Sequence, residues 1–255
     1  MFLGDSFTWG LGVRPEETFV AEVERRLRAQ RPDAAVPVHA VNFGWVSSSP
    51  VLQARQLLQI GAKYKPHLVV QCLDMSDFHD DLTYVELLRA AGQDRPFEIT
   101  TARALRSMLS TALGVRDYGD WLAAHTRLEF STEAAAHGRP DRRFFPAWQP
   151  LDRSRPWLGT TWDAILHTRA AATEMGAKFV LLILPRYPQY DRRMAPRDPE
   201  RAAWPPGDEF VFEIFRFFRE KTPAAPFPIR SLLDRFVKTG AFPTSTAYTP
   251  FDVGA

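Results

Sequence analysis

Apolar residues along the chain fall into two patterns that follow one another in turn. Short continuous apolar runs, typical of strands buried in a parallel sheet, occur at residues 36–44, 66–77, 177–185 and 226–236. Stretches spaced as amphipathic helices occur at residues 14–30, 49–64, 160–176 and 207–221. Before them, Met1, Phe2 and Leu3 form a short first strand. This alternation predicts an α/β fold, a flavodoxin-like three-layer α/β/α sandwich around a central parallel sheet.

Two features of residues 49–64 predict where this helix starts and which face it buries. Ser49 and Pro50 are residues that commonly begin a helix, so we expect it to start there. Leu57 and Leu58 are expected to face the core. In the stretch 207–221, the phenylalanines are expected to pack in the core rather than to hold a cofactor.

Residues 85–158 interrupt the alternation of strands and helices. Residues 100–114 have helical spacing, whereas residues 137–157 are rich in Pro, Arg and aromatic residues and predict an ordered loop. We therefore predict a single domain over residues 1–255, with an insertion at about 85–158 that covers the strand ends as a lid or substrate wall.

Composition narrows the class of protein. With 45% hydrophobic and 24% charged residues, the 255-residue chain matches a globular domain that can bury its own core. The net charge of +2 is too small to predict a nucleic-acid partner. No apolar run reaches the roughly 18 residues of a membrane span, and the single cysteine, Cys72, has no partner for an internal disulfide. Cytoplasmic and exported locations both stay open, since we expect sequence upstream of Met1, and nothing indicates the oligomeric state.

The tripeptide GDS at residues 4–6 closes the first predicted strand. Its glycine permits a tight turn into a helix, which would leave the Ser6 hydroxyl at the edge of the sheet. Gly44 follows the second strand, and Ser76 and Asp77 follow the third, so all three fall at the same edge. Parallel α/β sheets bind ligands at this edge, beyond the carboxyl ends of the strands. Ser6 is therefore a candidate nucleophile.

The blocks FLGDSFTWG, NFGWVSS, DMSD and PFDVGA, in this order along the chain, resemble those of the SGNH/GDSL hydrolase family. The resemblance implies a serine esterase in which Ser6 is the nucleophile. It implies an oxyanion hole formed by the backbone N–H groups of Ser6 and Gly44 and by a side chain of the third block, where Ser76 and Asp77 stand. It also implies an Asp-x-x-His pair near the carboxyl terminus, with Asp252 as the acid, and no cofactor.

The sequence departs from this family pattern at two places. Ser76 stands where the third block usually has asparagine, and the loss of one oxyanion donor lowers the rate by about 10²–10³-fold. After Asp252, Ala255 occupies the position of the histidine, or the histidine follows Ala255. We expect the second, because the chain starts and stops abruptly.

The remaining histidines offer no clear substitute. His39 and His67 belong to predicted strands and suit packing or surface roles. His79 and the acidic Asp80 and Asp81 predict either a solvated loop after the third strand or a part of the pocket. They do not make a full ligand set, so no metal is predicted.

We interpret the chain as a serine ester hydrolase that forms an acyl-enzyme on Ser6, with a small-molecule or saccharide ester as substrate. The arginines and aromatic residues of 139–157 fit a solvated loop or a wall that binds a sugar. The alternatives are a catalytically impaired binding protein for acylated saccharides and an acyltransferase. A nucleotide-binding domain built on Gly10-Leu11-Gly12 is disfavoured, because the third glycine of the dinucleotide fingerprint is missing.

Overall fold

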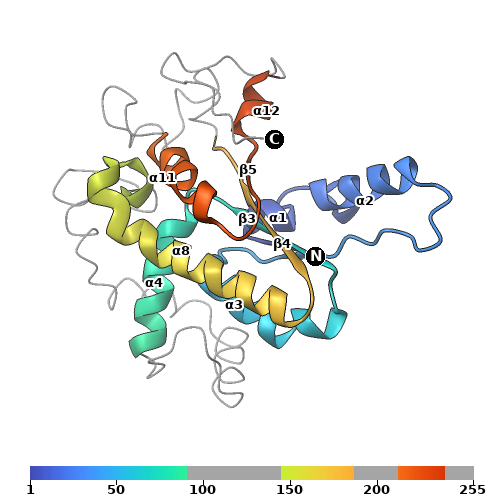
Figure 1. Ribbon diagram of the computed structural model, residues 1–255, viewed down its shortest axis with the longest axis horizontal. Helices are drawn as coiled ribbons and strands as arrows, with labels where there is room; N and C mark the ends of the chain where they lie inside the picture. Colours follow the sequence, from blue (N-terminus) through green and yellow to red (C-terminus); the bar gives the residue numbers. More distant parts are fainter. Residues whose placement is uncertain (91–144, 187–211, 239–255) are drawn as a thin grey trace.

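The computed structural model describes residues 1–90, 145–186 and 212–238 (Figure 1). Strands alternate with helices, and the strands form one parallel five-stranded sheet with the order β2-β1-β3-β4-β5. In chain order the elements are β1 (Phe2–Gly4), α1 (Ser6–Trp9), η1 (Pro15–Glu17), α2 (Phe19–Gln30), β2 (Asn42–Gly44), α3 (Pro50–Gln59), η2 (Gly61–Tyr64), β3 (Leu68–Leu73), α4 (Asp77–Ala90), η3 (Phe145–Trp148), α8 (Leu151–Glu174), β4 (Lys178–Ile183), α11 (Glu213–Lys221), η4 (Thr222–Ala224), β5 (Ile229–Ser231) and α12 (Leu233–Lys238). The predicted three-layer α/β fold with a parallel sheet is confirmed.

Side chains of β1 show how the layers form, because neighbouring residues of a strand point to opposite faces. Phe2 meets Phe19 of α2 edge to face, with ring centroids 5.8 Å apart. Leu3 is fully buried on the other face, in one cluster with Leu57 of α3. Helix α2 therefore covers one face of β1 and α3 covers the other.

The main core lies between the sheet and the helices α3, α4, α8 and α11, which lie against one another (Figure 1). Phe179, Leu181 and Ile183 of β4 alternate with less buried neighbours and point into this core. The phenylalanines of α11 join them: Phe215, Phe217 and Phe218 are at most 2% exposed. Their predicted role in core packing is confirmed.

One predicted helix boundary and one predicted core residue are wrong. The helix predicted at 14–30 is divided at Thr18, whose hydroxyl accepts the Ala21 N–H and so begins α2. Leu58 of α3 is 43% exposed, whereas Leu57 is buried as predicted.

The proline-rich stretch predicted as a loop over residues 137–157 becomes helical from Leu151 onward, where α8 begins. Pro156 lies inside this helix. A proline inside a helix removes one hydrogen bond of the ladder, and its ring crowds the carbonyl four residues before it. The packing of α8 against α3 and α4 stabilises the helix despite this cost. Most of the predicted insertion at 85–158 lies outside the described residues.

Candidate functional site

Ser6 is the first residue of α1, directly beyond the carboxyl end of β1. The turn before it requires glycine at position 4, because a Cβ there would stand 2.1 Å from the Thr8 hydroxyl oxygen. Asp5 caps the helix, since its carboxylate accepts the Phe7 N–H at 2.9 Å. The side chain of Ser6 is half-buried. The sheet thus holds Ser6 at its carboxyl edge, as the sequence predicted.

Gly44 ends β2 next to α1. A Cβ on Gly44 would lie 2.2 Å from the Trp9 backbone nitrogen, so only glycine lets the two backbones approach. Its own N–H donates to the Oδ1 of Asn42 at 2.9 Å. Asn42 also donates to the Thr8 carbonyl at 2.8 Å. Gly44 therefore lies beside the turn that holds Ser6, and its N–H is engaged by Asn42.

Ser47, in the loop between β2 and α3, is a residue that the sequence reasoning missed. Its φ of +60° lies in the left-handed region, which serine rarely adopts. The loop is fixed on both sides: Ser48 donates to the Gly4 carbonyl at 2.8 Å, and Tyr84 of α4 donates to the Ser47 carbonyl at 2.5 Å. Within the described part of the chain the Ser47 N–H has no acceptor. The loop thus offers a free N–H near the turn that holds Ser6.

The turn after β3 buries Asp74, Ser76 and Asp77. Ser76 directs both its N–H (3.0 Å) and its hydroxyl (2.6 Å) at Oδ2 of Asp74. The Asp74 N–H in turn donates to Asp77 at 2.8 Å. The hydroxyl of Ser76 therefore stabilises this turn, and it would have to leave Asp74 in order to act as the oxyanion donor predicted for it.

Arg186 is the second residue that the sequence reasoning missed. It follows β4, and its guanidinium donates to both carboxylate oxygens of Asp74, at 2.8 and 2.7 Å. The same group lies over the ring of Phe7, 4.7 Å from the centroid. Arg186 thus connects the ends of β4 and β3 with α1. The only signal in the sequence is its place just after the apolar run 177–185.

Burial raises the pKa of two side chains near this edge of the sheet, Asp77 and Cys72. The pKa of Asp77 is raised well above its usual range, first by burial and then by the neighbouring charges of Asp5 and Asp74. Burial also raises the pKa of the Cys72 thiol to about 12, which leaves this cysteine unreactive. The Oδ1 atom of Asp77 has no hydrogen-bond partner in the described residues.

Asp81 secures the start of α3. Its Oδ1 accepts the Val51 N–H at 2.8 Å, which makes it a cap supplied by α4. Burial raises its pKa to about 7, while the hydrogen bond from the Val51 N–H opposes the shift. The prediction of a solvated loop at residues 79–81 is wrong: these residues form the first turns of α4, where Asp81 is fully buried and His79 lies 3.4 Å from Asp80.

The predicted base and acid of Ser6 are not brought to it by the described residues. Asp252 lies outside them, as does the chain after Lys238. His39 is exposed in the segment before β2 and contacts Arg28, and His67 precedes β3, at the opposite edge of the sheet from Ser6. The assignment of Asp252 stays a prediction.

No protein-family model and no curated protein matches this chain. No helix in residues 1–90, 145–186 and 212–238 has the length and apolar character to cross a membrane. The same residues contain no cluster of three or more side chains that could ligate a metal ion.

Proposed function

We propose that the chain is a serine ester hydrolase that works through an acyl-enzyme on Ser6. The observation that carries the proposal is the position of Ser6, half-buried at the first residue of α1 and directly beyond the end of a parallel strand. Ligands of such sheets bind at this edge. The proposal is further supported by the order of the four sequence blocks, which resembles that of SGNH/GDSL hydrolases.

In the proposed reaction, the Ser6 hydroxyl attacks the ester carbonyl and its proton passes to a base. The tetrahedral intermediate expels the alcohol and leaves the acyl group on Ser6, and water then releases the acid. Donors for the oxyanion would come from the backbone N–H of Ser6 and from that of Ser47, which is without an acceptor in the described residues. Asp252 is proposed as the acid that orients the base.

Hydrolysis of p-nitrophenyl acetate by the full chain tests this proposal. We expect Ser6→Ala to abolish turnover and to leave the fold intact, because the Ser6 hydroxyl makes no hydrogen bond within the described residues. Ser154→Ala is the matched control, since Ser154 is a serine buried in α8. Undiminished turnover in the Ser6→Ala variant would refute the proposal.

A second candidate is a binding protein that has lost turnover. The bond from the Ser76 hydroxyl to Asp74 favours it, because this hydroxyl is the one that replaces the expected asparagine. This candidate predicts no hydrolysis by the wild-type chain together with retained affinity for the ester. An acyltransferase would instead transfer the acyl group of p-nitrophenyl acetate to an added sugar alcohol faster than to water.

A further inference from the structure

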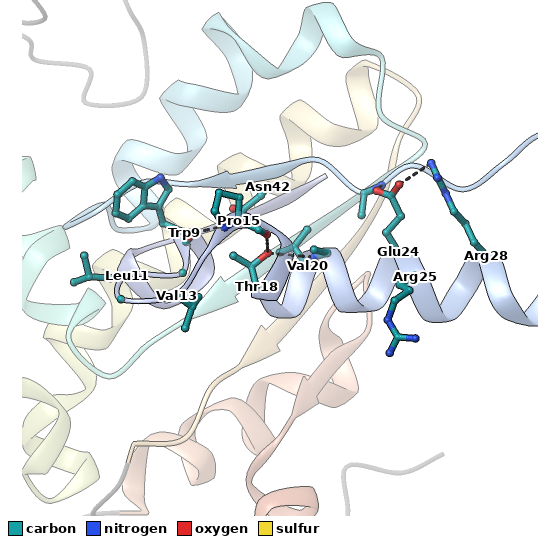
Figure 2. Close-up of a pocket in the computed structure, with 14 residues that line it drawn as sticks. Trp9, Leu11, Val13, Pro15, Thr18, Val20, Glu24, Arg25, Arg28 and Asn42 are labelled. Carbon is teal, nitrogen blue, oxygen red and sulfur yellow. Dashed lines mark hydrogen bonds and ion pairs between the residues drawn. The ribbon is translucent and has the colours of Figure 1, made fainter.

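A groove of about 900 Å³ lies between α2 and the residues that follow α1 (Figure 2). Trp9, Leu11 and Val13 lie at one end, and Glu24 and Arg28 lie at the other. The three apolar side chains are 51%, 64% and 51% exposed. Large apolar side chains gathered on one exposed surface are typical of a binding site.

The apolar end of this groove adjoins the candidate nucleophile. Trp9 follows Ser6 by three positions in α1, and residues three apart are neighbours on one helix face. The Ser6 carbonyl also accepts the N–H groups of Gly10 and Leu11, both at 3.0 Å, and both residues line the groove. A molecule in the groove would therefore have one end at Trp9, which lies on the same face of α1 as Ser6.

Polar side chains fixed in position line the rest of the groove. Asn42 is held by Gly44 and Thr8, and Glu24 is held by Arg28 at 2.6 Å and by the Ala40 N–H at 2.7 Å. The bonds of Arg28 use its Nε and Nη2. Its Nη1 therefore keeps two donors with no acceptor in the described residues.

An apolar end next to a polar end with fixed charges excludes two classes of ligand from this groove. An acyl chain would bury Glu24 and Arg28 against methylene groups without replacing their contacts with water, which is costly. An anion would face Glu24, and Arg25 is already paired with Glu22 at 2.6 Å. A sugar ring, in contrast, has an apolar face for an indole and hydroxyls for amide, carboxylate and guanidinium groups.

We infer that this groove binds the saccharide part of an acylated carbohydrate, with one sugar ring against Trp9 and the hydroxyls of the sugar units that follow it against Asn42, Glu24 and Arg28. The inference rests on the proposed function, because it assigns the alcohol portion of the ester that Ser6 cleaves. The acyl group would then lie beyond Trp9, on the side of Ser6.

The test measures binding in the absence of turnover. The full chain with Ser6→Ala is titrated in a calorimeter with an acetylated xylo-oligosaccharide. In this background, Trp9→Ala is expected to weaken binding about tenfold, the effect of withdrawing roughly 60 Å² of apolar contact. Ala21→Trp, which fills the groove from α2 and keeps Trp9, is expected to weaken it at least as much. Tyr64→Ala, at an equally exposed aromatic residue in η2, should leave the affinity unchanged.

The possible outcomes separate this inference from the proposed function. Equal affinity in the Trp9→Ala and Ala21→Trp variants, or no binding at all by Ser6→Ala, would overturn the saccharide site. Tighter binding of decanoate than of the oligosaccharide would also overturn it, in favour of an acyl-chain site. Saccharide binding that depends on Trp9, together with no hydrolysis of p-nitrophenyl acetate by the wild type, would support the site and overturn the hydrolase.

Discussion

Removal of the Arg186 guanidinium should be the most damaging single change at the sheet edge. The Arg186 and Asp74 side chains are only 10% and 2% exposed, and they form two hydrogen bonds of 2.8 and 2.7 Å. In Arg186→Met, the Asp74 carboxylate would stay buried without a cation. Breaking a buried pair in this way costs about 3–5 kcal/mol. For a domain of this size each kcal/mol lowers the melting temperature by about 2–4 °C, so we expect a decrease of roughly 6–20 °C.

The surface pair Arg155–Glu220 supplies a matched control. Its two groups lie 2.6 Å apart but are 46% and 42% exposed. Exposed pairs contribute at most about 1 kcal/mol, so Arg155→Met should lower the melting temperature by no more than about 4 °C. Thermal unfolding followed by circular dichroism compares the two variants. Should Arg186→Met not fold, Arg186→Lys, which keeps the charge without the planar fork, should give an intermediate loss. Equal melting temperatures for Arg186→Met and Arg155→Met would contradict the reasoning.

Three further predictions concern Asp81, Gly44 and Ser47. Burial raises the pKa of Asp81 from 3.8 to about 7, so the protonated Asp81 contributes fully to the free energy of unfolding below about pH 4, and this contribution is lost as the pH rises through 7. In urea titrations, the stability of Asp81→Asn relative to wild type should therefore increase between pH 5 and 8. A difference in stability that is constant with pH would contradict this. Gly44→Ala, whose Cβ would meet the Trp9 backbone, should lower stability by about 1–3 kcal/mol, whereas Gly159→Ala, with open space around it, should be neutral or stabilising; equal effects would refute the close approach. Ser47→Gly should raise stability by about 1 kcal/mol, because glycine adopts φ +60° without strain; a destabilised variant would contradict the assigned conformation.

The fold was predictable because its strands are buried in a parallel sheet. A strand such as Leu68–Leu73 is buried for most of its length, and so all of its residues except Gln71 are apolar. The position of Ser6 followed from the same logic, since the end of the run locates the end of the strand. The start of α8 at Leu151 was missed, because local proline and arginine content favours a loop and only the packing of α8 against α3 and α4 stabilises a helix there.

The contacts of the site were less predictable than its location. Arg186 reaches Asp74 across 112 positions of sequence, and no local pattern indicates such a pair. Ser47 has a backbone conformation that is common for glycine, and no sequence pattern indicates it at a serine, whereas Gly44 was expected as a donor from the family resemblance alone. The Gly44 N–H donates to the Asn42 side chain because of the rotamer that Asn42 adopts, and the amino-acid sequence does not specify this rotamer.

The proposed function depends most directly on Ser6 as the nucleophile. Treatment of the full chain with a fluorophosphonate, followed by mass spectrometry of the peptides, identifies the modified residue. We expect a single modification at Ser6, absent after Ser6→Ala and unaffected by Ser154→Ala. Modification of another residue, or none at Ser6 in a folded chain that hydrolyses p-nitrophenyl acetate, would contradict it.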